Sequence, residues 1–446
     1  MEAQSEDTSV RAVFELAWPV MVSMLSYTLM SVVDTLWVAR LGMAPLAAVG
    51  LAAVMVFFSQ SFGAGLMGGV RVLVAQATGA GDHVVARTMG WQALWMALPL
   101  GVLVSSVSLL PASMFYPLGA SGAVAEYADQ FFSIRVLGAP VVLINLAMTA
   151  WFQGRGDTRT PMKATLIGNG VNLTLDPLLI FGLWGLPALG VGGAALATVV
   201  SLMVQVAYLS WHIRPHLDLK SSSVDFELMK SSWNLGFPIG VRYSLQMGSF
   251  VIFSSMISWV GENHLAAHVI VLRICSISFM PGHAVGEACS VLVGHFVGAG
   301  RSNLARPVVR SALKLAVGIM VFWGVVFVVC PDQLLLPFGA TIEVAGLAKD
   351  LLIVAAIFQV FDAVTMASQG GLNGAGDTRW VMVSSLSCAW FLKLPAGYLG
   401  AVVFGLGAVG AWLGFTLELF ILSMLTWNRV RGGQWLRGAA LDTSSR

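Results

Sequence analysis

The sequence contains little charge, since Asp, Glu, Lys and Arg make up only 10% of its 446 residues. Soluble proteins carry about 25% charged residues, so this composition excludes a water-soluble globule of this length. The charges also nearly cancel, with 24 Lys and Arg against 22 Asp and Glu. The balance therefore gives no electrostatic case for a DNA or RNA partner.

Cysteine is scarce, and the sequence motifs of catalysis are missing. Four cysteines lie in apolar stretches without CxxC spacing, which argues against a zinc site or a disulfide framework. The sequence has no GxxxxGK[ST] phosphate-binding motif, no paired nucleophile and base, and no cofactor loop. Three histidines between residues 268 and 295 lack metal-ligand spacing. We therefore expect neither an enzyme nor a bound metal or cofactor.

Apolar residues are abundant, at 57% of the chain, and a helix needs about 20 of them to span a bilayer. The acidic, polar first ten residues do not resemble the basic start of a secretory signal. Clusters of Gly, Pro and charge divide the chain into twelve apolar segments: 13–39, 46–77, 89–111, 125–152, 161–183, 190–212, 233–259, 265–297, 308–330, 345–372, 379–400 and 406–428. This pattern predicts an all-α integral membrane protein of twelve transmembrane helices.

An even number of spans places both termini on the same side of the membrane. Most Lys and Arg residues of the short connections lie on that side, whereas Arg40 and Lys349 are the clear candidates for the opposite side. Because basic residues mark the cytoplasmic side, we expect both termini in the cytoplasm of a cell with the protein in its inner membrane.

The chain repeats itself at an offset of about 219 residues. ELAWPVMVSMLSY, which contains Pro19, matches NLGFPIGVRYSLQ, which contains Pro238. VLVAQATGAG matches VLVGHFVGAG, and GRGDTR matches GAGDTR further along. Ordered matches at nearly one spacing indicate a duplicated unit of six helices. Six spans per copy make the two copies parallel, as in transporters with two lobes around a central cleft.

The repeat defines four predicted regions of the chain. They are an N-lobe (1–212), a charged cytoplasmic linker (213–231), a C-lobe (232–430) and a cytoplasmic tail (431–446). In each lobe the GDTR loop is interpreted as a glycine turn whose aspartate, Asp157 or Asp377, caps the following helix.

Over essentially its whole length, the chain resembles the multidrug and toxic compound extrusion (MATE) transporters. The resemblance lies in the two lobes, in VDTLWVARLG around Asp34, in NGVNLTLDPLLIFG around Asp176, and in the paired GDTR loops. It implies a secondary antiporter that expels cationic or amphipathic drugs in exchange for protons or sodium ions, by moving the lobes about the cleft. Within this family, the chain resembles the proton-coupled, DinF-like branch more closely.

Acidic residues inside spans are functional candidates because a carboxylate at the bilayer centre costs roughly 2.5 to 3.5 kcal/mol. The candidates are Asp34, Asp176, Glu287, Asp362 and Glu418. Asp34 shares its helix with Pro19, and a proline inside a helix permits a kink. Pro19 is therefore the predicted hinge.

The fifth segment places Asn169, Asn172 and Asp176 on one helix face, at spacings of three and four residues. The resemblance implies that Asp34, Asn172 and Asp176 form the cation site, with Thr198 as a further polar member. Two neighbouring carboxyl groups in an apolar environment can share a proton. The alternative is a structural hydrogen bond that fixes the two helices without any change of protonation.

The coupling ion follows from a comparison with sodium-coupled relatives, in which two C-lobe acids are important. The matching positions here are Gln246, a neutral amide, and Asp362, an acid. An amide removes a negative charge from an ion cage, which disfavours sodium. We therefore expect a proton to be the coupling ion.

In the C-lobe, Lys393, Arg242 and Arg273 are candidate partners for Asp362 and Glu287. The alternatives left open for these charges are a buried structural network and a role in drug recognition.

Tyr27, Trp37 and Gln246 are the predicted cleft-facing contacts for drugs, because they share helices with the repeated prolines. Cation–π contacts there could hold an organic cation. We expect a monomer whose partners are small organic cations or amphipathic drugs and the lipid bilayer.

Two rival functions remain open at this stage. One is a related two-lobe flippase for lipid-linked oligosaccharides, for which the sequence lacks a converging row of basic residues. The other is a pore or a membrane scaffold without transport activity.

Overall fold

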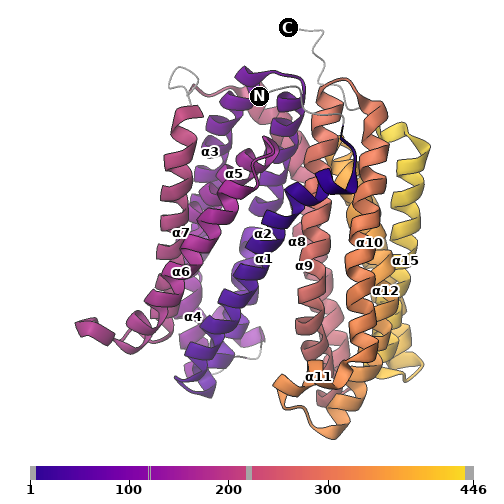
Figure 1. Cartoon of the computed structure of the whole chain (residues 1–446). Helices are drawn as coiled ribbons and strands as arrows, with labels where there is room; N and C mark the ends of the chain where they lie inside the picture. Colours follow the sequence, from indigo (N-terminus) through magenta and orange to yellow (C-terminus); the bar gives the residue numbers. More distant parts are fainter. Residues whose placement is uncertain (1–6, 119, 121, 217–222, 437–446) are drawn as a thin grey trace. The chain divides into compact units, whose positions relative to one another are not determined.

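The computed structural model describes residues 7–118, 120, 122–216 and 223–436, and this part of the chain is helical with short connections. Each of the twelve apolar segments falls on a helix or on a run of adjoining helices (Figure 1). Their bounds are α1 (Val10–Ala39), α2 (Met43–Gly79), α3 (His83–Ser105), α4 (Ala123–Leu137) with α5 (Ala139–Gly154), α6 (Arg159–Phe181), α7 (Val191–Ile213), α8 (Phe226–Val260), α9 (Glu262–Gly298), α10 (Ala305–Val329), α12 (Ile342–Gly374), α13 (Thr378–Cys388) with α14 (Leu394–Tyr398), and α15 (Gly407–Gly432).

The all-helical membrane class predicted from the sequence is confirmed. Within the described residues, ten helices are long and apolar enough to cross a membrane, and the bent pair α4 and α5 makes an eleventh span. The pair bends by 47° at Gly138, where Pro140 cannot donate a backbone hydrogen bond to the preceding turn. The remaining predicted segment, 233–259, lies on α8.

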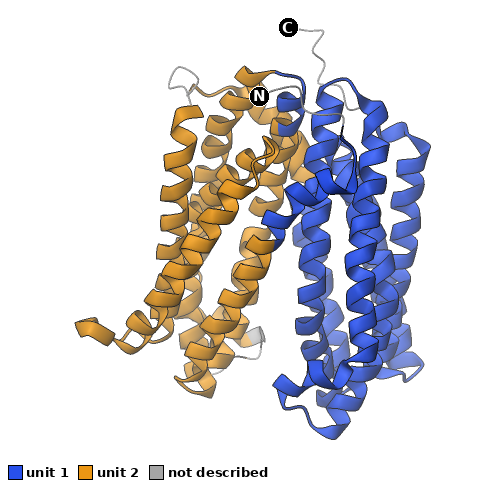
Figure 2. Cartoon of the chain, viewed as in Figure 1, with its two compact units in different colours: residues 1–21, 75–81, 241–446 blue, residues 22–74, 82–240 orange. Residues whose placement is uncertain are grey.

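The chain divides into two compact units (Figure 2). Unit 1 comprises residues 1–21, 75–81 and 241–446, and unit 2 comprises residues 22–74 and 82–240. The backbone passes from one unit to the other within α1 after Met21 and within α8 after Gly240. Each of these two crossings lies shortly after a repeated proline in the sequence, Pro19 before Met21 and Pro238 before Gly240.

Unit 1 is built around α12, which packs against α9, α10 and α15. Its buried core includes Phe327, Phe358 and Trp412. Unit 2 pairs α6 with α7 and α3 with α5, and its core includes Phe115 and Phe132, whose rings meet edge to face at 5.7 Å. Helix contacts in a membrane depend on such close packing because lipid is as apolar as the side chains.

The repeat is visible in unit 1 as a reciprocal helix crossing between the end of α2 and the end of α9. A Cβ atom at Gly79 would overlap the backbone carbonyl of His295, and one at Gly298 would overlap that of Gln76. Gly79 is the repeat counterpart of Gly298, and Gln76 is that of His295. The crossing therefore requires a glycine in each copy.

Candidate functional site

Helix α6 presents a polar face inside unit 2, as its spacing predicts. Asn169 is 8% exposed, and Asn172 and Asp176 are fully buried. Asn172 Nδ2 donates to Asp176 Oδ1 at 3.4 Å. Asn169 Nδ2 donates to Ser26 Oγ of α1 at 2.7 Å, so this face lies against α1.

Asp34 completes the contact between α1 and α6. It lies two turns after Ser26 on α1, and its carboxyl group interacts with that of Asp176. One oxygen of each acid, Asp34 Oδ1 and Asp176 Oδ2, is buried and has no hydrogen-bond donor among the described residues. Two ionised carboxylates offer only acceptors, so a hydrogen bond between them requires one proton.

A buried cation also lies near this pair, and the sequence analysis did not assign it to the site. Arg135 of α4 is 8% exposed and acts electrostatically on Asp34. Its Nη1 atom is buried and has no acceptor within the part of the chain that the structure describes. With one positive and two acidic groups, the cluster of Asp34, Asp176 and Arg135 is neutral when the acids hold a single proton.

The other predicted N-lobe residues have varied surroundings. Thr198 of α7 is buried, and its hydroxyl donates to the Ala194 carbonyl at 3.0 Å, so its membership of the cation site stays a prediction. Trp37 packs edge to face on Phe181 at 6.0 Å. Tyr27 is 50% exposed on α1.

The C-lobe candidates form a second charged cluster, in unit 1. Lys393 is 1% exposed, and its Nζ atom lies 3.7 Å from Glu418 Oε2 and 2.9 Å from Ser249 Oγ. Glu418 in turn acts electrostatically on Asp362, which is 8% exposed. Lys393 thus forms its ion pair with Glu418 of α15, whereas the sequence analysis named it as one candidate partner for Asp362 and Glu287. This happens because α15 packs directly on the segment that carries Lys393.

Two further C-lobe candidates lie on α8 and α9. Gln246 is half-buried on α8, and its backbone carbonyl accepts from the Ser249 hydroxyl at 2.7 Å. Glu287 is half-buried on α9.

A short π-helical segment, η8 (Ala389–Lys393), positions Lys393. Pro395 follows it and cannot donate a hydrogen bond to the preceding turn. Wider π turns of this kind are rare and often occur at functional sites.

His268 is a core residue of unit 1. Its ring is fully buried, accepts at Nδ1 from Trp412 Nε1 at 3.0 Å and contacts Ser254 Oγ through Nε2 at 3.0 Å. Both ring nitrogens therefore have partners within the protein. No group of three or more metal-ligating side chains occurs in the described part of the chain.

The two GDTR loops have the same turn but different bonds. Gly156 and Gly376 both adopt positive φ, at 84° and 92°. Asp157 accepts from the backbone N–H groups of Arg159 at 3.1 Å and Thr160 at 3.0 Å, so the predicted helix cap is confirmed in the N-lobe.

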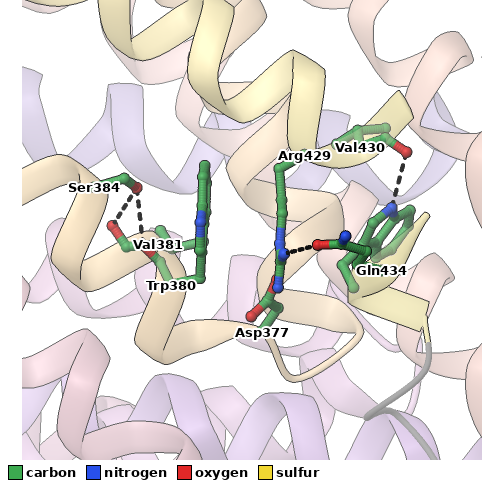
Figure 3. A network of polar contacts seen from close by, with 8 residues as sticks. Asp377, Trp380, Val381, Ser384, Arg429, Val430 and Gln434 are labelled. Carbon is green, nitrogen blue, oxygen red and sulfur yellow. Dashed lines mark hydrogen bonds and ion pairs between the residues drawn. The ribbon is translucent and has the colours of Figure 1, made fainter. Parts of the chain in front are cut away.

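The capping prediction is wrong for Asp377, whose side chain makes no capping hydrogen bond. Its Oδ2 atom instead accepts from Arg429 Nε at 2.9 Å (Figure 3). The Arg429 guanidinium also donates to Gln434 at 2.7 Å and lies 5.5 Å from the Trp380 ring centroid. The Asp377 carboxylate therefore accepts a hydrogen bond from Arg429 of α15 in place of the backbone N–H groups of its own helix.

Comparison with known proteins supports the duplicated organisation of the chain. The MatE family model matches residues 19–178 and 238–399, one stretch in each copy of the repeat. The chain is 30% identical to the probable multidrug resistance protein NorM of Pseudomonas putida, over 92% of both chains. It is 31% identical to the multidrug resistance protein NorM of Burkholderia vietnamiensis, over 92% of this chain and 91% of the relative.

A solved structure shares the fold. A multidrug resistance MATE family transporter in an outward-facing conformation superimposes with a TM-score of 0.89 at 24% identity, over 96% of this chain and 97% of that chain. Together, the duplicated match, the full-length relatives and the shared helical fold show that the chain belongs to the MatE family of membrane transporters.

Proposed function

We propose that this protein is an inner-membrane antiporter that exports cationic or amphipathic drugs in exchange for protons. The multidrug resistance names of its NorM relatives support drug export and favour it over lipid-linked oligosaccharide flipping. The contact between the Asp34 and Asp176 carboxyl groups carries the proton part of the proposal. With Arg135 beside them, one proton separates a neutral cluster from a negative one.

The two charge states give the cluster two uses. The negative state attracts an organic cation, and the neutral state lets that cation leave. Asn172 serves both states because its amide donates to Asp176 while its own oxygen, buried and without a donor in the described residues, can accept from a protonated carboxyl.

The conformational change is assigned to α1. Pro19 is buried in this helix, just before the backbone passes from unit 1 to unit 2. Bending near Pro19 links the protonation of Asp34 to movement of one unit against the other. The predicted lobes and linker, the cytoplasmic termini, the monomeric state and the DinF-like branch belong to the same proposal. The predicted linker includes residues 217–222 and the predicted tail includes residues 437–446, and both of these stretches lie outside the described residues.

Transport driven by separate ion gradients tests the proposal. Purified protein in liposomes should move a fluorescent organic cation when only a pH gradient is imposed, with choline as the sole other cation. An equal sodium gradient without a pH difference should give no transport above that of empty liposomes. Transport that follows the sodium gradient and ignores the pH gradient would contradict proton coupling.

A further inference from the structure

One end of unit 2 holds a cluster of basic side chains that the proposed transport cycle does not use. Its centre is Trp151 of α5, which is fully buried and donates from Nε1 to the Ala86 carbonyl of α3 at 2.7 Å. Arg87 follows directly on α3. Helix α5 packs against both α3 and α7, so the beginning of α3 meets the ends of α5 and α7 here.

Two further basic side chains lie against the same tryptophan. The guanidinium carbon of Arg155, the residue that follows α5, lies 4.5 Å from the Trp151 ring centroid. The His216 ring, in the short helix η4 (Arg214–His216), lies 6.0 Å from that centroid. The charge of Arg87 acts on both Arg155 and His216. Three basic groups from three separate elements therefore converge.

The positive charge of this cluster is only partly compensated. None of the three basic side chains has a hydrogen-bond acceptor in the part of the chain that the structure describes. An acid, Asp157, acts on Arg155 and His216. Its carboxylate already accepts from the backbone N–H groups of Arg159 and Thr160 and from the Thr160 hydroxyl. Two guanidinium groups beside one occupied carboxylate leave a net positive charge.

A neighbouring tryptophan indicates the depth of the cluster in the membrane. Trp211, in the last turn of α7, is 70% exposed, and the Arg214 guanidinium lies 5.8 Å from its ring centroid. Tryptophans at the ends of spanning helices are typical of the level of the lipid headgroups. Basic pockets between spanning helices at this level bind anionic headgroups.

The second copy of the repeat is built without such a cluster. The position that matches Arg155 is Ala375. The arginine that matches Arg87 is Arg306, and a Cβ atom at Gly433 would overlap its guanidinium, so this arginine is covered. Packing of the six helices therefore does not require an open arginine pair at this end.

We propose that Arg87, Arg155 and His216 form a binding site for a phosphate group, and that this group belongs to the headgroup of an anionic phospholipid. Guanidinium groups bind phosphate oxygens through paired N–H donors, and the imidazole donates from a ring N–H in either protonation state. Trp151 holds the Arg155 guanidinium in place. The inference concerns this end of unit 2 and is independent of the proposed proton exchange.

Thermal unfolding of the purified protein in mixed micelles tests this proposal. Phosphatidylglycerol should raise the Tm of the wild-type protein by about 2–4 °C over an equal amount of phosphatidylcholine, because a ligand that binds only the folded state stabilises it. Arg87→Gln and Arg155→Gln should each lose this rise. In phosphatidylcholine, Arg87→Gln should unfold at no lower temperature than the wild-type protein, since it removes a repulsion and no hydrogen bond to a described residue.

Arg310→Gln is the matched control, because Arg310 is an exposed arginine of α10 in unit 1, and this variant should keep the whole rise. If Arg155→Gln cannot be recovered folded, Arg87→Gln decides. Sodium phosphate, compared with sodium chloride at equal ionic strength, separates the two sources of the phosphate group. A rise with soluble phosphate and none with phosphatidylglycerol would overturn the assignment to a lipid. No rise with either, or an equal rise in the wild-type protein and both variants, would overturn the site itself.

Discussion

Asn172 donates a hydrogen bond to Asp176 one turn further along α6, with 3.4 Å between Nδ2 and Oδ1 and both side chains fully buried. A buried carboxylate depends strongly on such a donor, since little else can replace the water it has lost. The amide therefore belongs to the machinery that allows Asp176 to exist in its charged form.

Asn172→Ala should slow drug transport under a pH gradient by about tenfold, because a hydrogen bond to a charged group contributes about 1.5–3 kcal/mol and this one is long. Initial rates in liposomes measure the effect. Thr174→Ala is the control, since Thr174 is an exposed residue of the same helix whose hydroxyl donates to the Gly170 carbonyl. Equal rates for Asn172→Ala and the wild-type protein would exclude the amide from the transport cycle.

Asp34→Asn and Asp176→Asn should each abolish transport driven by a pH gradient, and the double variant should lose no more than either single variant. The reason is that the two carboxyl groups share one proton and act as a unit. The rates of the four proteins form a double-mutant cycle. Independent losses that multiply in the double variant would mean that each acid works separately.

The reciprocal crossing of α2 and α9 predicts a stability effect. Gly79→Ala and Gly298→Ala should each lower the free energy of unfolding by about 1–3 kcal/mol, as overpacking does. Gly318→Ala on α10, where a new Cβ meets nothing within 4 Å, should not destabilise the protein. Thermal unfolding of the purified variants compares them. A Gly79→Ala protein as stable as Gly318→Ala would show that the crossing is looser than described.

The two GDTR aspartates should respond differently to the same substitution. Asp157→Asn should be nearly neutral because Asn caps helices as well as Asp does. Asp377→Asn should cost about 1.5–3 kcal/mol, since it removes the charge from the bond to Arg429. Tm values of the two variants check this, and equal values would show that the ion pair in Figure 3 contributes nothing measurable.

Some of this site could be predicted from the sequence because it depends on local periodicity. The spacing of Asn169, Asn172 and Asp176 fixes their common face on a helix, and the structure buries that face. The Gly156 and Gly376 turns follow equally from the conformational freedom of glycine.

Contacts between helices could not be predicted in the same way. The pairing of Lys393 with Glu418 depends on a π-helical turn before Pro395 and on the rotation of α15, neither of which has a sequence period. Arg135 was missed as a member of the acidic cluster because α4 is distant in sequence from α1. Asp377 was assigned as a cap because its partner, Arg429, comes from another helix.

The most direct test counts the protons that drug binding releases from the purified protein in weakly buffered detergent solution. Addition of a saturating organic cation should release about one proton per bound drug from the wild-type protein, as expected if one proton is shared by two carboxyl groups. The exposed-acid control Asp332→Asn should release the same amount, and Asp34→Asn and Asp176→Asn should release none. Undiminished release from both of these variants would contradict the assignment of the exchanged proton to this pair.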